Sequence, residues 1–287
     1  MKKTIKSINE YLKKWKLHSP IELSRSSTSQ VYKVSSGSRF AILKLLTSNG
    51  QCDEKYASSA LRNFSGNGAI NILKSDEFAQ LLEYIDGGSL TKIFLEGSEY
   101  EDIKIICATL KKLHQAKCID MLPHFSHRFI SLRSRMLRDG KELDILDYLC
   151  RTAVPILEEL LAEKVDEVVL HGDMHHENIL FDKVRGWLAI DPKGLYGDRA
   201  YDVANIFLNP RGFDNIVYSA ERISNIADVI ANEMTLDPHR ILKYAFVQAC
   251  LSACWSLEDG DSPERAIRIA QVIRYNLLAF KSDINIF

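Results

Sequence analysis

The feature that most constrains this chain is the stretch HGDMHHENILFDKVRGWLAIDPKG, residues 171–194. Two short apolar runs, ILF and WLAI, flank the turn DKVRG, which is the pattern of a β-hairpin. Asn178 precedes the first run and Asp191 follows the second, so a hairpin brings these two side chains together. Asp173 stands five residues before Asn178, after the apolar run VVL. The stretch therefore predicts a hairpin whose open end carries an amide and two carboxylates.

These three side chains indicate a particular chemistry. An amide oxygen beside a carboxylate suits Mg²⁺, which takes oxygen ligands and keeps substrate phosphates in its shell. Phosphoryl transfer needs such a set, because its loose transition state depends on positioning and charge neutralisation. An isolated Asp in a loop is usually a turn former or a helix cap, but this combination around one hairpin is rarer. We predict that Asn178 and Asp191 bind the metal and that Asp173 is the catalytic base.

Length, composition and charge limit the class of protein. The chain has 287 residues, 46% hydrophobic and 26% charged, which suits one large domain or two modest ones with a real core. A net charge of −1 gives no electrostatic case for nucleic acid. Residues 1–86 have 13 Lys and Arg against 8 Asp and Glu, whereas residues 87–287 have 24 against 30. A basic first part suits a nucleotide and an acidic second part a cationic partner, although scattered surface charge explains the same counts.

The N-terminal segment and the cysteines bear on location. No segment has the roughly 20 apolar residues of a membrane-spanning helix. Ile5, Ile8, Leu12 and Trp15 recur at helical spacing, which predicts an amphipathic helix packed on the protein itself rather than on a membrane. The six cysteines form no C-x-x-C pair and no signal peptide is present, so we expect free thiols and a cytoplasmic protein. The sequence does not indicate an oligomeric state.

The chain changes character at DGGS, residues 86–89. Before it, residues 21–47 predict strands, with two alternating runs about SSGS and a polar loop, SRSSTSQ, ahead of them. DEKYASSALRN, residues 53–63, predicts a helix, and AINILKS and FAQLLEYI predict two further strands. Beyond DGGS helical periodicity dominates on both sides of the hairpin, including residues 198–209.

This organisation predicts an α+β protein of two lobes. The N-terminal lobe, residues 1–86, has a small antiparallel sheet, and the C-terminal lobe, residues 87–287, is larger and mainly helical.

Several motifs resemble those of the aminoglycoside phosphotransferases, which are relatives of the protein kinases. HGDMHHEN resembles the catalytic loop of that family, with Gly172 where the kinase motif H-R-D-x-x-x-x-N has arginine. IDPKG stands where kinases carry D-F-G, and both departures are usual in small-molecule kinases. GDRAYDVAN and WSLEDG also match, and the resemblance makes Asp202 a buried support of the catalytic loop. Covering about residues 20–260, it is closest to the streptomycin phosphotransferase and hydroxyurea-resistance kinase branch, and it implies a protein-kinase-like bilobal fold.

The resemblance places the nucleotide phosphates beside the N-terminal lobe. Lys44, in the strand FAILKLL, takes the place of the kinase lysine that grips the phosphates, and Glu54 takes that of its helix glutamate, with Asp53 as the alternative. A glycine-rich loop is missing, and SRSSTSQVYKV stands in its place. There, backbone N–H groups and the hydroxyls of Ser27 and Thr28 would cradle phosphates, although serine runs are usually plain loops. The implied cofactors are ATP, or GTP, and Mg²⁺.

The base and the acceptor are placed by the same resemblance. LLEYIDGG resembles the kinase hinge, in which the backbone of Glu83 and Ile85 would bind the base. The acceptor pocket falls near Trp255 and an acidic cluster that follows it, made of Glu258, Asp259 and Asp261. Carboxylates bind guanidinium groups and a tryptophan ring stacks on them. These residues therefore suit a small cationic acceptor, although a solvated helix end with a buried Trp explains them as well.

Three functions remain open at this stage. The first is an ATP-dependent O-phosphotransferase that acts on a streptomycin-like aminoglycoside. The second is a kinase of another small hydroxyl or amine compound, such as a sugar, choline or hydroxyurea. The third is a nucleotide-binding pseudokinase, against which the intact Lys44, Asp173, Asn178 and Asp191 argue.

Overall fold

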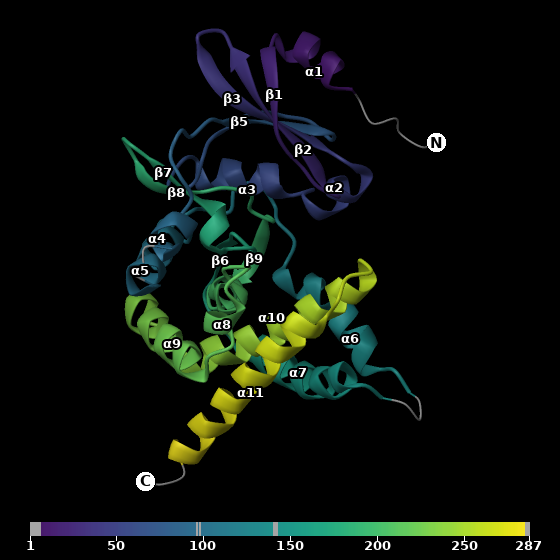
Figure 1. The fold of residues 1–287 in the computed structure, drawn as a ribbon, viewed down its shortest axis with the longest axis vertical. Helices are drawn as coiled ribbons and strands as arrows, with labels where there is room; N and C mark the ends of the chain where they lie inside the picture. Colours follow the sequence, from purple (N-terminus) through teal and green to yellow (C-terminus); the bar gives the residue numbers. More distant parts are fainter. Residues whose placement is uncertain (1–6, 96, 98, 140–142, 285–287) are drawn as a thin grey trace.

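A five-stranded antiparallel sheet occupies one end of the molecule and helices fill the other (Figure 1). The computed structural model describes residues 7–95, 97, 99–139 and 143–284, so Ile5 lies outside the described residues. The strands are β1 (His18–Arg25), β2 (Ser29–Ser36), β3 (Arg39–Leu46), β4 (Ile72–Ser75) and β5 (Ala79–Glu83), in the order β1-β2-β3-β5-β4. The predicted α+β architecture, with a small sheet and a larger helical part, is confirmed.

The sheet has one apolar face, which helix α1 (Ile8–Trp15) covers. Alternate residues of the central strands point toward Tyr11 and Trp15 of this helix, because successive side chains of a strand face opposite sides. Leu43 and Leu45 of β3 belong to this small core, so Lys44 between them points to the other face. The amphipathic N-terminal helix therefore packs on the protein's own sheet, as its spacing predicts.

Two expectations about local structure in this part are wrong. The polar loop SRSSTSQ is shorter than expected, because β1 and β2 extend into it and only residues 26–28 connect them. The helix expected over residues 53–63 is two helices, α2 (Ser48–Asp53) and α3 (Ala57–Phe64). The first begins early because the Thr47 side chain accepts a hydrogen bond from Gly50 N at 3.2 Å and so caps it.

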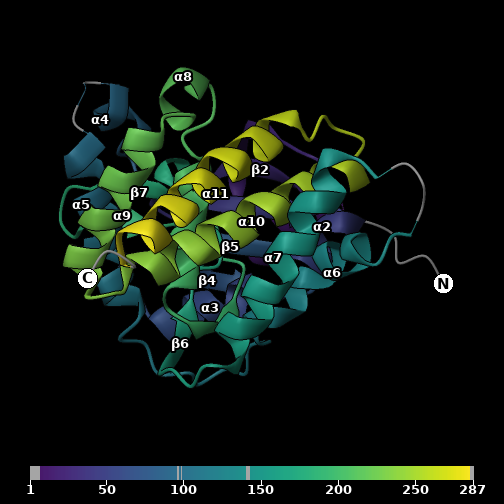
Figure 2. The same ribbon diagram turned by 90° about the horizontal axis from the view of Figure 1, so that it is seen from below.

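The helical part surrounds α10 (Pro238–Glu258), which is buried along most of its length. Seen from below, α10 and α11 (Glu264–Ile284) lie side by side, with α6 and α7 on one side and α5 and α9 on the other (Figure 2). The remaining helices are α4 (Thr91–Leu95), α5 (Glu99–Leu113), α6 (Ile130–Met136), α7 (Ile145–Ala162), α8 (Asp214–Val217) and α9 (Ala220–Met234). In the part of the chain that the structure describes, no helix is both long and apolar enough to span a membrane.

Short strands and 3₁₀ helices carry the polar motifs. The predicted hairpin is present as β7 (Ile179–Asp182) and β8 (Gly186–Ala189), and β6 (Glu167–Leu170) pairs with β9 (Leu195–Asp198). The 3₁₀ helices are η1 (Phe125–Phe129), η2 (His176–Asn178) and η3 (Tyr201–Leu208). The α-helix expected over residues 198–209 is therefore wrong: Asp198 ends a strand, and a 3₁₀ helix follows.

The hairpin also joins the two ends of the molecule. Leu90 N donates to Ile179 O and Phe181 N donates to Gly88 O, both at 3.0 Å, so the linker after β5 runs along β7. On the other side, Ala189 N donates to Gly68 O at 2.8 Å. The hairpin is therefore hydrogen-bonded both to the segment before β4 and to the linker after β5.

The close approach of the linker to β7 gives a test of this arrangement. A Cβ added at Gly87 would lie 1.7 Å from the backbone oxygen of Phe181, whereas one added at Gly88 would meet only the flexible end of the Lys92 side chain. We expect Gly87→Ala to lower the free energy of unfolding by about 1–3 kcal/mol, since backbone must move. Gly88→Ala is the matched control and should change it less. Urea denaturation measures the free energy of unfolding of both variants. Equal decreases would contradict the close contact between Gly87 and the backbone of Phe181.

Candidate active site

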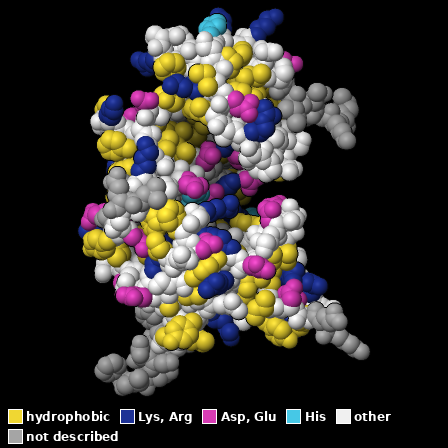
Figure 3. All heavy atoms as spheres, in the orientation of Figure 1, with side chains coloured by type: hydrophobic (Ala, Val, Ile, Leu, Met, Phe, Trp, Pro, Cys, Tyr) yellow, Lys and Arg dark blue, Asp and Glu magenta, His cyan; other side chains and the backbone are white. Residues whose placement is uncertain are grey.

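A cleft of about 730 Å³ separates the sheet from the helices. Figure 3 shows it as a hollow in which acidic and basic side chains gather. Most of the residues that the sequence singled out line it: Ser27, Thr28, Lys44, Glu54, Asp173, Asn178, Asp191, Trp255, Glu258 and Asp259. Glu83, Ile85 and Asp261 are not among the residues that line it.

A buried lysine joins the sheet to the hairpin. Lys44 Nζ lies 2.7 Å from Glu54 Oε2 and 2.9 Å from Asp191 Oδ1, and Lys44 is only 3% exposed. Burial favours the neutral amine, but the carboxylates of Asp191 and Glu54 outweigh it and raise the pKa of Lys44. Asp53, the alternative partner, pairs instead with Lys193. Lys44 is therefore a positively charged side chain that two carboxylates fix in the wall of the cleft.

The serine-rich turn between β1 and β2 is held by contacts with the start of α2. Thr47 Oγ1 donates to Ser27 O at 2.6 Å, and Thr47 N donates to Thr28 O at 2.8 Å. A Cβ added at Gly50 would lie 2.0 Å from Thr28 O, so α2 and the turn are in direct contact. The Ser27 and Thr28 side chains line the cleft from this fixed turn.

The end of β5 is held by contacts outside the cleft. The Glu83 carboxylate accepts hydrogen bonds from Asn71 N at 2.9 Å and Asn71 Nδ2 at 3.0 Å, and it pairs with Arg185 Nη2 at 2.6 Å. Glu83 N donates to Asn71 O at 2.9 Å. The side chain and the N–H of Glu83 are therefore already engaged.

The loop around Asp173 is fixed at its backbone. Asn178 Nδ2 donates to Asp173 O at 2.9 Å, and Asp173 N donates to His171 Nδ1 at 3.2 Å. The opposite nitrogen of that ring, Nε2, donates to Ile190 O at 2.8 Å. Asp173 Oδ1 accepts a hydrogen bond from Asn205 Nδ2 at 2.8 Å.

Nearby charges keep Asp173 ionised. Burial alone raises the pKa of a carboxyl group, but His175, Lys193 and Arg128 outweigh it and hold the pKa of Asp173 below its ordinary value. Asp173 is therefore a carboxylate at neutral pH, able to accept a proton from a group in the cleft.

Asp202 supports this loop from η3. Its carboxylate accepts hydrogen bonds from His171 N at 2.9 Å and Gly172 N at 2.6 Å, and it is 1% exposed. Gly172 has a φ of +79°, and a Cβ there would meet Leu195 Cδ1 at 2.6 Å, so the arginine of the kinase motif does not fit this backbone. Arg128 donates to Gly172 O from the other side.

Asn178 and Asp191 flank the open end of the hairpin, and both line the cleft. Ile190 N donates to Asn178 O at 2.9 Å, and the Asp191 side chain is 45% exposed. Asp191 has a φ of +57°, an unfavourable backbone for this residue and one that concentrates at functional sites. Within the described residues, no group of three or more His, Cys, Asp and Glu side chains is arranged to hold a metal. An amide and a carboxylate, completed by phosphate oxygens and water, nevertheless fit Mg²⁺.

The end of the cleft beside the C-terminal end of α10 is lined by both acids and arginines. The Arg128 guanidinium carbon lies 4.7 Å from the centre of the Trp255 ring, so an arginine of the protein already stacks there. Glu258 Oε2 accepts a hydrogen bond from Ser131 Oγ at 3.0 Å, and Asp259 caps the C-terminal end of α10. Arg128 and Asn205 were not identified from the sequence; a polar Asn within the apolar run VANIF was the available signal for Asn205.

A buried acid and a buried histidine lie close together, one in α5 and the other in η2. His176 Nε2 is 3.9 Å from Asp102 Oδ2, both side chains are 0% exposed, and their side-chain N and O atoms have no hydrogen-bond partner. Burial, with the nearby Glu99 and Glu101, raises the pKa of Asp102 to about 7. Burial lowers the pKa of His176 to about 3. Both groups therefore favour their neutral forms.

Two solved structures of similar fold are an aminoglycoside phosphotransferase and a choline kinase. The apo form of a thermostable mutant of aminoglycoside phosphotransferase APH(4)-Ia is similar with a TM-score of 0.67 and 17% identity, over 93% of this chain and 98% of that one. Choline kinase LicA from Streptococcus pneumoniae is similar with a TM-score of 0.66 and 16% identity, over 94% and 97%. The fold is therefore that of the protein-kinase-like small-molecule kinases.

Sequence similarity gives the family. The model of the aminoglycoside/hydroxyurea antibiotic resistance kinase family matches residues 14–260, and the chain belongs to that family. It is 32% identical over 253 residues to a streptomycin 3''-kinase of Klebsiella pneumoniae, covering 87% of this chain and 92% of that protein. It is 27% identical over 280 residues to a hydroxyurea phosphotransferase of Kitasatospora aureofaciens, covering 93% and 77%. The protein is thus a phosphotransferase of the antibiotic-resistance kinase class.

The buried acid at Asp102 predicts a pH-dependent stability. Because its folded pKa of about 7 exceeds the ordinary value of 3.8, the unfolded chain loses this proton first, and the contribution of Asp102 to stability falls as the pH rises from about 4 to about 7. The Asp102→Asn side chain cannot ionise. As the pH rises from about 4 to about 7, the free energy of unfolding of this variant should therefore increase by at least ~1 kcal/mol relative to that of the wild type. Denaturant melts at several pH values measure this difference. The exposed Asp228→Asn is the control; a constant difference for Asp102→Asn contradicts the assignment.

Proposed function

We propose that this protein transfers the γ-phosphoryl group of ATP to a hydroxyl group of a streptomycin-like aminoglycoside, with Mg²⁺ as the metal. The observation that carries the proposal is the convergence of Lys44, Asp173, Asn178 and Asp191 on one cleft in a chain of this family. The similarity to a streptomycin 3''-kinase supports the choice of acceptor. Solved relatives that hold AMP-PNP or ADP together with hygromycin B support the nucleotide and the kind of acceptor.

The nucleotide is assigned to the sheet side of the cleft, in a lobe that we place at residues 1–86. The Lys44 ammonium, aligned by Glu54, would bind the phosphates, and the turn with Ser27 and Thr28 would cover them. The base would bind the carbonyl of Glu83 and the N–H of Ile85, because the Glu83 N–H is engaged with Asn71. Because the backbone makes these contacts, the side chains at these positions do not select between ATP and GTP, and both nucleotides are to be compared.

The chemical step is assigned to the helical lobe, residues 87–287. The acceptor hydroxyl oxygen forms a bond to phosphorus while the bond from phosphorus to the bridging oxygen of the diphosphate breaks, which releases ADP. The hydroxyl proton passes to Asp173, whose low pKa makes this a late transfer. When bound by Asn178 and Asp191, Mg²⁺ neutralises charge on the phosphates. Lys44 supplies positive charge to the same groups from the sheet.

The acceptor is assigned to the end of α10. Arg128 already stacks on the Trp255 ring. We therefore assign recognition of a cationic acceptor to the carboxylates of Glu258 and Asp259. Asp261 follows α10 and would contribute only long-range attraction, since it does not line the cleft.

A second candidate is a kinase of another small acceptor. The similarity to a hydroxyurea phosphotransferase favours it, because the same family model covers both kinds of enzyme. A pseudokinase is disfavoured by the intact contact of Lys44 with Glu54 and Asp191.

The acceptor is tested by measuring ADP release from ATP and from GTP with a panel of compounds. Streptomycin, hygromycin B, hydroxyurea, choline and a sugar are each compared with the rate without acceptor. We expect streptomycin to stimulate ADP release most. Stimulation by hydroxyurea or choline alone would select the second candidate, and no stimulation by any aminoglycoside contradicts the first.

The assignment of Asp173 is tested by Asp173→Ala. Loss of a general base costs typically 10²–10⁴-fold in rate, so kcat should fall by that factor. The affinity for ATP, measured by calorimetry, should change less than about threefold, since Asp173 is assigned to the acceptor hydroxyl. Asp166→Ala, an exposed aspartate before β6, is the control. An unchanged kcat in Asp173→Ala would contradict the assignment of Asp173 as the general base.

A further inference from the structure

The side chain of Asn205 makes a contact to which the proposed function gives no role. Asn205 lies in η3, and its Nδ2 donates to Asp173 Oδ1 at 2.8 Å. We infer that Asn205 is a positioning residue, which fixes the rotation of the Asp173 carboxylate so that Oδ2 faces the acceptor hydroxyl. This inference rests on the proposed function, because it takes Asp173 to be the base.

The hydrogen bond from Asn205 restricts the rotation of the Asp173 carboxylate, which the other contacts of the loop leave free. The backbone of Asp173 is held by Asn178 and His171, and these bonds do not restrict rotation of its carboxylate. The terminal torsion of an aspartate is broad, with no sharply staggered wells. A hydrogen bond to a charged group is stronger than one between neutral groups, so it is able to select one orientation. Asn205 therefore leaves one oxygen engaged and the other for the substrate.

Other polar groups near Asp173 act differently. His171 and His175 come from the same loop, Lys193 follows β8, and Arg128 comes from η1; all four influence the Asp173 carboxylate electrostatically. Two of them have partners elsewhere, since Lys193 pairs with Asp53 and Arg128 donates to Gly172 O. In the part of the chain that the structure describes, no other side chain donates a hydrogen bond to this carboxylate.

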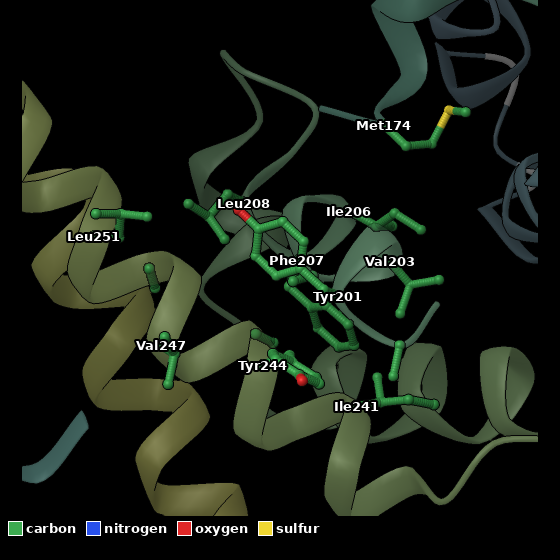
Figure 4. Close-up of a cluster of buried hydrophobic side chains, with 14 of the residues drawn as sticks. Met174, Tyr201, Val203, Ile206, Phe207, Leu208, Ile241, Tyr244, Val247 and Leu251 are labelled. Atoms are coloured by element: carbon green, nitrogen blue, oxygen red, sulfur yellow. The ribbon is translucent and has the colours of Figure 1, made fainter. Parts of the chain in front are cut away.

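The element that carries Asn205 is firmly held on its other side. Figure 4 shows Tyr201 and Phe207 of η3 near Tyr244 of α10, and Tyr201 OH donates to Gln248 Oε1 at 2.9 Å. The polar Asn205 lies instead among the residues that line the cleft.

A chain of hydrogen bonds ties the end of η3 to α5 and α9. Asn209 Nδ2 donates to Asn205 O at 2.9 Å, and Arg222 Nη2 donates to Asn209 O at 2.7 Å. Arg222 Nε donates in turn to Glu99 Oε1 at 2.6 Å. Asn205 therefore presents its amide from a rigid support, as precise positioning of a reacting group requires.

The alternative is that Asn205 only stabilises the fold. The two roles differ in a double-mutant cycle with Asp173. A residue that acts through Asp173 loses its effect when Asp173 is absent, whereas a structural residue costs activity in both backgrounds. The cycle needs Asn205→Ala, Asp173→Ala and the double variant in the full chain.

The experiment measures kcat and KM for ATP and streptomycin in each variant, with ADP followed over hours for the slow ones. We expect Asn205→Ala to lower kcat by about 10–100-fold with both KM values within about threefold, because a misplaced group affects the transition state. In the Asp173→Ala background the further loss should be less than about twofold. Asn205→Asp keeps the shape but replaces the donor with a second carboxylate, so its kcat should fall at least as far.

The controls separate the possible failures. Asn276→Ala removes a buried helical asparagine outside the cleft, which bonds Ser224 and Val272 O, and should lower the melting temperature without lowering kcat. Wild-type kcat in both Asn205 variants, or an equal loss in both Asp173 backgrounds, overturns the inference. If Asp173→Ala itself keeps full turnover, the proposed base fails instead, so the two failures are distinguishable.

Discussion

The site depends on one buried ion pair network, in which the Lys44 ammonium lies between the carboxylates of Glu54 and Asp191. Removing a charge from water is costly, and only close opposite charges compensate for it. The network therefore holds its shape only while β3, the segment between α2 and α3, and the open end of the hairpin are in place together. Glu54 precedes the hairpin by more than a hundred residues, so the lysine binds the two ends of the molecule as well as preparing a phosphate site.

The sequence predicts the local parts of this site well. Asp173, Asn178 and Asp191 lie within one hairpin and its preceding loop, so their spacing along the chain determines their spacing in space. The alternation of FAILKLL likewise places Lys44 opposite its apolar neighbours, because strand geometry has a period of two. Patterns of this kind are decided by neighbouring residues and do not depend on the rest of the fold.

The parts that the sequence misses depend on distant contacts or on weak local signals. Arg128 and Asn205 lie 44 and 32 residues from the loop positions they contact, and nothing in their immediate neighbours indicates those partners. The expected helix over residues 53–63 is divided because a cap at Thr47 starts α2 early. Strand β1 is exposed along its whole length, so no burial pattern marks its end in the serine-rich segment. The choice between Glu54 and Asp53 likewise needed the pairing of Asp53 with Lys193.

The stacking of Arg128 on Trp255 has a consequence for how such an enzyme changes over generations. The same guanidinium contacts Trp255, in the wall of the pocket proposed for the acceptor, and the backbone oxygen of Gly172, immediately before the proposed base. A mutation that reshapes this wall to admit a new drug therefore also disturbs the reacting group. Glu258, about one helical turn beyond Trp255 on α10, is itself hydrogen-bonded to Ser131, so it is tied to the same segment as Arg128. Asp259, exposed at the end of α10, is the position at which the pocket can change with less effect on that segment.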